Sequence, residues 1–443
     1  MLNPNEARDR AQEIVARARG AGADAADAVY AADTALEVAV RLGALEDVGR
    51  SESADLSLRV FVGQRSASVS TSDFSELGAL AERAVAMARE APEDQWAGLA
   101  PEARLLRGQP GDLDLDDGAA VEPETLRALA LSTEDAARGV AGVTNSEGGG
   151  ASASRSVVAL ATSHGFAGSY AVTSYGLSAS VLAGTGGGMQ RDYAYASARH
   201  FDALEDAATV GRRAGERAVA RVNPGKLASG PLPVVFEPRV GASLLGHLVG
   251  AISGAAIARK TSFLQDALGT RVFAPDVTIH DDPQRPRGLR SRPFDGEGLP
   301  VAATDLVSDG VLQTWLLDSA SARQLGLEPT GHATRQGGGV TTSNLHLANG
   351  GVSAAELIGE IADGVYVTEL IGMGVNGVTG DYSRGAAGFR IVGGALAGPV
   401  AEFTIAGNLR DMFLALVPAN DLEFRYATNV PTVRIDGMTV ASG

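Results

Sequence analysis

The sequence predicts an α+β protein of two domains, on three observations. The chain has 443 residues, which exceeds one average domain. Hydrophobic residues make up 45% and charged residues 20%, which is normal for a folded globular protein. Helical and alternating patterns form two groups, separated by the breaker NPGK at residues 223–226. We therefore expect an N-terminal α+β domain over residues 1–222 and a mostly antiparallel β domain over residues 223–443.

The first domain is predicted to combine antiparallel strands with flanking helices. Asn3 or Asn5 can cap a first helix, in which Ala11, Ile14 and Val15 share one side. Segments such as LEVAVRL and SLRVFV alternate in the manner of half-buried strands. The Pro-, Gly- and Asp-rich stretch that follows the second helix is expected to lie on the surface. Helices are predicted over 5–19, 74–91, 123–138 and 203–222, strands over 35–43, 55–62, 66–71 and within 140–198, and the surface stretch over 93–117.

The strands between Val140 and Ala198 are long and rich in Ser, Thr, Tyr and Gly, as in SRSVVALATS and GSYAVTSYGLSASVLAG. They carry few large apolar side chains that could form a tightly packed core. We therefore expect their sheet to be partly solvated or to contact an extended segment.

The second domain is predicted to be organised around one helix over residues 240–260. Leu245, Leu248 and Ile252 recur at three- and four-residue steps, which predicts an amphipathic helix facing a core. The rest is mostly β-structure with tight Asp-Gly or Gly-Gly turns, and a short helix over 409–418. The predicted strands lie in PLPVVFEP, VTIHDDP, LVSDGVLQTWLLD, GVYVTELIG, FRIVGGALAGPVAEFTIAGN and PTVRIDGMTV.

Glycines form a second stripe on this helix. Gly246, Gly250 and Gly254 lie four residues apart, between Ala242 and Ala258. Each glycine costs a helix roughly 1 kcal/mol relative to alanine, so about 3 kcal/mol must be recovered elsewhere. Close approach of another backbone or helix would recover it, and an ordinary Ala/Gly-rich helix is the alternative.

Composition excludes several classes of function. The formal charge of −16 disfavours direct binding to nucleic acid or to anionic membranes. Cysteine is absent, which excludes disulfides, thiolate nucleophiles and cysteine metal sites. The first residues form a charged helical pattern rather than a signal peptide, and no window approaches a membrane span. We expect a cytoplasmic protein.

None of the six histidines lies three or four residues from another, so no local pair of metal ligands is present. His280 precedes Asp281 and Asp282, but neighbouring strand residues point to opposite faces, and we favour a strand-end turn over a metal site. His247 lies beside the glycine stripe. We favour a histidine packed in a core or subunit contact, and the alternative is a residue that touches substrate.

An arginine-rich segment precedes the turn FDGEG. Arg285, Arg287, Arg290 and Arg292 fall in one short stretch of an acidic chain. Guanidinium groups at this density suit carboxylates across a contact, or else internal salt bridges. We take Arg290 and Arg292 as candidates for contact with substrate or partner, and expect Asp295 to accept backbone N–H bonds in the turn.

The glycine-rich run TGDYSRGAAGF, residues 379–389, is expected to be a loop. Asp381, Tyr382 and Arg384 are polar groups that such a loop could present to a partner. The run lacks G-x-x-x-x-G-K-[ST], so nucleotide binding is not expected.

Together, SFLQDALG, RGLRSRPFDGEG, WLLDSASARQLGL, TGDYSRGAAGF and IAGNLRDMF resemble the TldD/PmbA family of metalloproteases. In the TldD-type subunit the central helix carries His-Glu-x-x-x-His after a Leu-Leu pair, and binds zinc. In this chain Gly246 matches the first histidine, His247 the glutamate and Ala251 the second histidine. Gly and Ala have no side-chain lone pair, and the C-terminal cysteine ligand of TldD is also missing. The chain therefore resembles the TldE (PmbA) type of subunit.

The resemblance implies a non-catalytic, metal-free subunit of a heteromeric zinc metalloprotease that cleaves unfolded peptides. A TldD-like partner would supply zinc and the general base, while this chain completes the chamber and holds an extended peptide by β-augmentation. A homodimer is expected when the chain is alone. The alternative is a regulatory protein of the DNA gyrase modulator type that acts through protein contacts. A self-sufficient Ser/Asp/His hydrolase is disfavoured because the chain has no G-x-S-x-G elbow.

Overall fold

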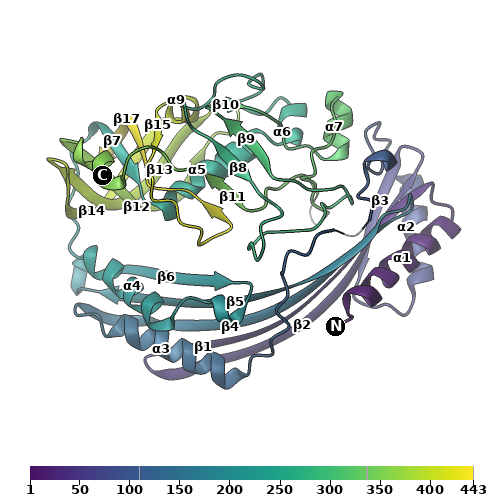
Figure 1. Ribbon diagram of the computed structural model, residues 1–443, viewed down its shortest axis with the longest axis horizontal. Helices are drawn as coiled ribbons and strands as arrows, with labels where there is room; N and C mark the ends of the chain where they lie inside the picture. Colours follow the sequence, from purple (N-terminus) through teal and green to yellow (C-terminus); the bar gives the residue numbers. More distant parts are fainter. Residues whose placement is uncertain (109, 336–337, 443) are drawn as a thin grey trace.

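The computed structural model describes residues 1–108, 110–335 and 338–442. Within these residues the main strands form three sheets, one from the N-terminal half of the chain and two from the C-terminal half. Most strand pairs are antiparallel, which confirms the predicted α+β class. Figure 1 shows the first sheet curving beneath the C-terminal half. The predicted domain boundary falls in the connection between α4 (Ala207–Ala220) and β7 (Gly230–Phe236).

The first sheet is antiparallel throughout, with strand order β3-β2-β1-β4-β5-β6. Its strands are longer than predicted, because β1 and β2 continue to a tight hairpin at Leu42 and Gly43, both with positive φ. The strands are β1 (Ala25–Arg41), β2 (Ala44–Val62), β3 (Arg65–Thr71), β4 (Val143–Thr162), β5 (Ala167–Ala183) and β6 (Gln190–Ala198).

Four helices cover the outer face of this sheet (Figure 1). Asn3 caps the first helix in a capping box with Glu6, as the sequence predicts. Tyr30 lies in the core under the first two helices, and Val38 in the core under the third. Apart from α4 the helices are α1 (Pro4–Gly20), α2 (Leu77–Glu90) and α3 (Pro123–Arg138), with short 3₁₀ turns at Glu102–Arg104, Gly186–Gly188 and Phe201–Ala203.

Part of the inner, concave face of the sheet is built from small side chains, while Val29 and Leu160 on the same face pack against Phe294. Side chains alternate between the faces of a strand, so Leu177 and Ala179 lie under the helices while Gly176 and Ser178 face inward. Gly176 and Ser178 line an open cavity of about 380 Å³ together with Ser152 of β4. The expected partly solvated sheet is therefore present, with its polar face toward the C-terminal half.

Strands of the C-terminal half form a closed ring and a second, smaller sheet. The ring runs β14-β13-β12-β7-β17 and closes because β14 also pairs with β17, while β15 extends it from β17. The smaller sheet runs β10-β9-β8-β11-β16. The strands are β8 (Ile279–Asp281), β9 (Thr304–Ser308), β10 (Val311–Leu312), β11 (Leu345–Leu347), β12 (Asp363–Val375), β13 (Asp381–Val392), β14 (Ala395–Asn408), β15 (Leu416–Pro418), β16 (Thr428–Asn429) and β17 (Val433–Ser442), and the short helices are α7 (Ser319–Leu325), α8 (Ala354–Gly359) and α9 (Leu409–Leu414).

The single helix predicted over residues 240–260 is wrong, because two helices occupy this stretch. They are α5 (Pro238–Ala251) and α6 (Gly254–Ala258). Backbone bonds with Leu316 interrupt the helix: Leu316 donates to the carbonyl of Ile252 at 3.0 Å and accepts from Gly254 at 2.7 Å. Ser253 between them is extended, and its side chain caps α6.

The stretch 93–117, expected at the surface, connects the two halves. Arg323 of α7 donates to the carbonyls of Trp96 and Leu99 at 2.9 and 3.0 Å. Further along, Arg287 bonds Asp114 at 2.6 Å. The stretch therefore fixes the C-terminal half over the sheet.

In the described residues, every helix is too short or too polar to cross a lipid bilayer.

Candidate functional site

The open face of α5 is the first part of the candidate site. Leu244, Leu245 and Leu248 point into the core, while Gly246 and Gly250 are exposed. A Cβ atom added at Gly246 or Gly250 would meet nothing within 4 Å. Close approach at these two glycines is therefore absent within the described residues, and they leave a smooth, open helix surface.

Gly254 behaves differently from the other two glycines of the stripe. A Cβ there would lie 2.7 Å from Leu317 Cδ2 and closer still to Ser321 Oγ. The predicted close approach is therefore right at Gly254, where α6 packs on α7, and wrong at Gly246 and Gly250.

His247 is partly buried on α5 and packs edge-on against Tyr382. The ring centroids are 5.9 Å apart with an interplanar angle of 79°. Burial lowers the pKa of His247, and the Arg384 guanidinium lowers it further. Its Nε2 atom and the Tyr382 hydroxyl are buried, and neither has a hydrogen-bond partner within the described residues. The imidazole is therefore a neutral, packed side chain in this conformation.

The motif positions on α5 do not fit a zinc ion. Gly246 and Ala251 offer no donor atom, and Ala251 is buried at the end of the helix. Across the described ranges, no group of three or more His, Cys, Asp or Glu side chains is arranged to hold a metal.

The run expected as a loop at residues 379–389 is mostly strand β13. Strand alternation exposes Asp381, which bonds Thr379 and Asn408, and buries Tyr382 to 1% exposure. Arg384 is half-buried and lines a cavity beside α5. Of the three predicted contact residues, Asp381 and Arg384 are accessible, whereas Tyr382 is buried and packs against the ring of His247.

The arginine-rich segment divides among several contacts. Arg292 donates to the carbonyl of Thr341 at 3.2 Å, and Arg285 lies 3.6 Å above the ring of Phe424. Arg287 bonds Asp114, so one of the expected salt bridges is present. Arg290 is exposed and lines a cavity of about 450 Å³ between the concave sheet and the C-terminal half.

In the turn FDGEG, the Asp295 carboxylate accepts backbone N–H bonds, as the sequence predicts. Asp295 accepts backbone N–H bonds from Glu297 and Leu299, both at 2.9 Å, and from Ala333 at 3.2 Å. Burial raises the pKa of Asp295 although these bonds oppose the rise.

His280 lies in strand β8 and forms a contact with Asp305 rather than with its neighbours in sequence. Its ring stacks on His346 with centroids 5.0 Å apart. This arrangement agrees with the strand-end turn expected for His280-Asp281-Asp282, since β8 ends at Asp281.

An arginine–carboxylate network at the junction of the halves was missed from the sequence. Asp192 of β6 bonds Arg221, the C-cap of α4, at 3.1 Å and Arg239 of α5 at 2.9 Å. Burial would raise the pKa of Asp192, but the hydrogen bond and charge of Arg239, with the charge of Arg221, lower it overall. Arg221 also contacts Glu369. The partners are far apart in sequence, so spacing gives no signal for the network.

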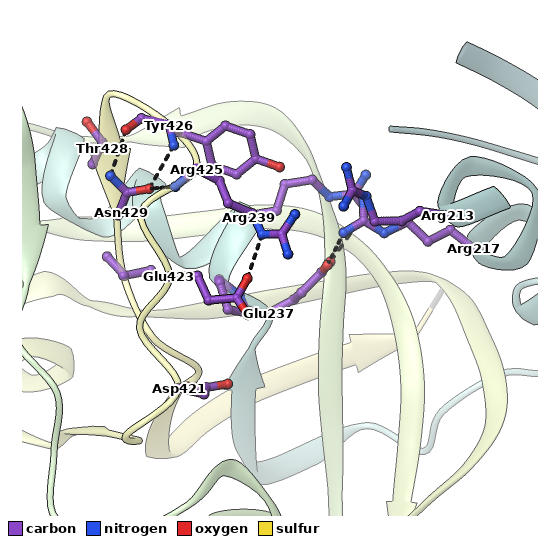
Figure 2. A pocket seen from close by; sticks show the side chains of 12 residues that line it. Arg213, Arg217, Glu237, Arg239, Asp421, Glu423, Arg425, Tyr426, Thr428 and Asn429 are labelled. Carbon is purple, nitrogen blue, oxygen red and sulfur yellow. Dashed lines mark hydrogen bonds and ion pairs between the residues drawn. The ribbon is translucent and has the colours of Figure 1, made fainter. Parts of the chain in front are cut away.

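A neighbouring cavity of about 270 Å³ lies beside this network (Figure 2). Glu237 bonds Arg217 at 3.0 Å and Arg239 at 3.4 Å, and Asn429 holds the backbone of Arg425 and Tyr426 (Figure 2). The cavities thus follow the seam between the sheet and the C-terminal half.

Comparison with known proteins shows which family shares these domains. Domain models of the PmbA/TldA metallopeptidases match residues 26–88 (domain 1), 116–222 (central domain) and 229–442 (C-terminal domain). Metalloprotease PmbA of Escherichia coli O157:H7 is 38% identical over 422 residues, which cover 94% of this chain and 92% of the relative. The chain belongs to the PmbA/TldD family. The PmbA homologue of Haemophilus influenzae is 36% identical and covers 98% of this chain and 96% of its own.

Solved structures agree with this PmbA/TldD membership. A Bacteroides thetaiotaomicron protein, described as a candidate modulator of DNA gyrase, matches with a TM-score of 0.92 and 26% identity over the whole of both chains. TldE of Thermococcus kodakarensis matches with a TM-score of 0.87 over 98% of this chain and 100% of its own. At 20% identity, the TldE match shows the shared fold.

Proposed function

We propose that this chain is the metal-free subunit of a heteromeric PmbA/TldD-type metallopeptidase that cleaves unfolded peptides. The observation that carries the proposal is α5, whose zinc-motif positions hold Gly246, His247 and Ala251 on an otherwise intact family fold. A TldD-like partner supplies the zinc, the general base and the bond-breaking chemistry. A cytoplasmic location and a homodimer in the absence of the partner are parts of this proposal.

The role of this chain is to hold an extended peptide by β-augmentation along β6. This strand is the edge of the concave sheet. The carbonyls of Arg191 and Tyr193 accept bonds from arginines outside the sheet, so alternate residues direct their main chain outward. At Tyr195 and Ser197 this outer edge has no main-chain partner within the described residues, and both border the cavity above the sheet. A peptide strand can pair there.

The test is hydrolysis of an unstructured peptide by the chain alone, a TldD-like partner alone and their mixture. We expect cleavage by the mixture and none by this chain. Ser197→Pro removes one outward N–H, which an edge strand tolerates, and should lower the peptide affinity of the mixture. The control is Ser53→Ala in β2, which changes another serine on the inner face of the sheet. Ser180→Pro is unsuitable as a control because β5 is an interior strand that pairs on both sides.

Cleavage by the pure, metal-stripped chain would overturn the proposal. Co-purification with gyrase without any TldD-like chain, and no effect on peptide cleavage, would instead support the gyrase-modulator alternative.

A further inference from the structure

A further cavity, of about 330 Å³, lies where the first turns of α5 meet β6, the end of α4 and strands β12 and β13. Its lining has an excess of positive charge, although the chain carries a formal charge of −16. The charged lining residues are Arg191, Arg221, Arg239, Arg384, Asp192 and Glu369.

Three of these arginines already contact carboxylates. Arg221 and Arg239 both bond Asp192, at 3.1 and 2.9 Å. Arg191 bonds Glu147 at 3.3 Å on the outside of the cavity. Their charges are therefore largely compensated by the protein itself.

Arg384 is the exception among the described lining residues. Its Nε donates to the carbonyl of Ile371 at 3.4 Å, and it has no ion pair with a carboxylate in the described part of the chain. Thr368 also lines the cavity, but its hydroxyl oxygen is buried and is not presented to a ligand there. The half-buried Arg384 guanidinium therefore lines the cavity without a charge partner, and the cavity lacks an anionic acceptor group that would pair with it.

The end of the free strand edge gives the position of this acceptor. Arginines occupy the outer edge of β6 at the carbonyls of Arg191 and Tyr193, so a peptide paired at Tyr195 and Ser197 cannot continue as a strand past Tyr193. Tyr193 lines the cavity that contains Arg384. With about 3.3 Å per residue, a peptide that ends beyond Tyr195 has its terminus near this cavity.

We infer that the cavity binds the C-terminal carboxylate of the peptide substrate, with Arg384 as the charge partner. Guanidinium groups pair with carboxylates through two parallel hydrogen bonds, which suits the uncompensated Arg384. An amino terminus would bring a positive charge against Arg384 and is disfavoured. This inference rests on the proposed pairing of peptide with β6.

The experiment compares a labelled unstructured peptide with a free C-terminal carboxylate and the same peptide as its amide, by fluorescence anisotropy on the full chain. We expect the amide to bind about ten- to hundredfold more weakly. Arg384→Gln should weaken the free acid to the level of the amide and leave the amide unchanged. Arg390→Gln, on the same strand but paired with solvent-exposed Asp363, should behave as wild type.

Equal affinity for acid and amide would overturn the inference, even if the mixture with a TldD-like partner still hydrolyses peptides. An equal loss for both peptides in Arg384→Gln would also overturn it. If inorganic phosphate competes in an Arg384-dependent manner while acid and amide bind equally, the cavity holds free anions rather than a peptide terminus. Thermal unfolding of both variants checks that each remains folded.

Discussion

At the residue scale, His247 has a pKa lowered first by burial and then by Arg384. An unfolded histidine titrates near 6.5, so below that pH the unfolded state binds more protons than the folded state. The free energy of unfolding is therefore fully retained above pH 6.5 and falls as the pH drops, by at most about 1.4 kcal/mol per pH unit for this group. His346 is shifted in the same direction, by burial and by His280.

We expect His247→Leu to flatten this acid side of the stability profile, because Leu cannot take up a proton. Denaturant unfolding at about pH 7.5 and about pH 5.5 measures how much the free energy of unfolding changes between the two pH values in wild type and variant. His346 remains in the variant, so part of the slope persists. Parallel profiles for wild type and His247→Leu would show that His247 titrates as it does in the unfolded chain.

Glu297 acts in the opposite direction. Burial raises its pKa from 4.5 to about 7, although Ser319 donates to it, and Asp295 and Asp318 add to the rise. Between these pH values the folded state retains a proton that the unfolded state has released. The free energy of unfolding therefore falls as the pH rises from 4.5 to 7, by about 3 kcal/mol at most.

We expect Glu297→Gln to be more stable than wild type above pH 7 and similar to it near pH 4.5. The amide oxygen can still accept from Ser319, whose N–H lies 2.9 Å from the carboxylate. Glu328→Gln is the surface control, since Glu328 pairs with Arg104 in solvent. A stability difference that does not change with pH would contradict this assignment.

Single side chains were predicted where their partners are close in sequence. Asp295 accepts from Glu297 and Leu299, two and four residues away, and the turn motif was sufficient to predict it. The partners of Asp192 lie in other elements, and nothing in the local sequence indicated them. Tyr382 was predicted at a surface, but its strand position turns it toward His247.

At the element scale, the glycine stripe gives two opposite expectations. Gly246→Ala adds a methyl group in open space and removes the helix penalty, so unfolding should cost about 1 kcal/mol more. Gly254→Ala places a methyl group 2.7 Å from Leu317, so the same change there should destabilise by about 1–3 kcal/mol.

Denaturant midpoints of the two variants measure these effects. In the mixture with a TldD-like chain, Gly246→Ala should reduce assembly or peptide binding if the open face of α5 is covered there. Destabilisation by Gly246→Ala in the isolated chain would contradict the open surface.

Helices with clear caps and apolar stripes were predictable, and α3 has the predicted bounds. The break after α5 was not, because Leu316, which causes it, lies more than sixty residues along the chain. The first half of β1 was missed because the Ala-rich segment AADAVYAADT shows little alternation. Its small residues are explained by the packing of α1 and α2 on them.

At the scale of the whole molecule, the sheet and the C-terminal half meet in one apolar cluster, where Val29 and Leu160 pack with Phe294 and Leu299, and they enclose a series of cavities elsewhere. The stretch 93–117 and Arg323 hold the halves together. The sequence predicted the kinds of surface involved, namely Ser/Gly-rich strands and an α5 without metal ligands. Their placement along one seam depends on long-range pairing that local patterns do not encode.

The most direct measurement is the zinc content of the purified chain, of a TldD-like partner and of their stoichiometric mixture, after dialysis against excess zinc. The account predicts no stoichiometric zinc on this chain and one tightly held ion per heteromeric pair, lost when the histidines of the partner are replaced. One tightly bound zinc on this chain alone, held by its own side chains, would contradict it.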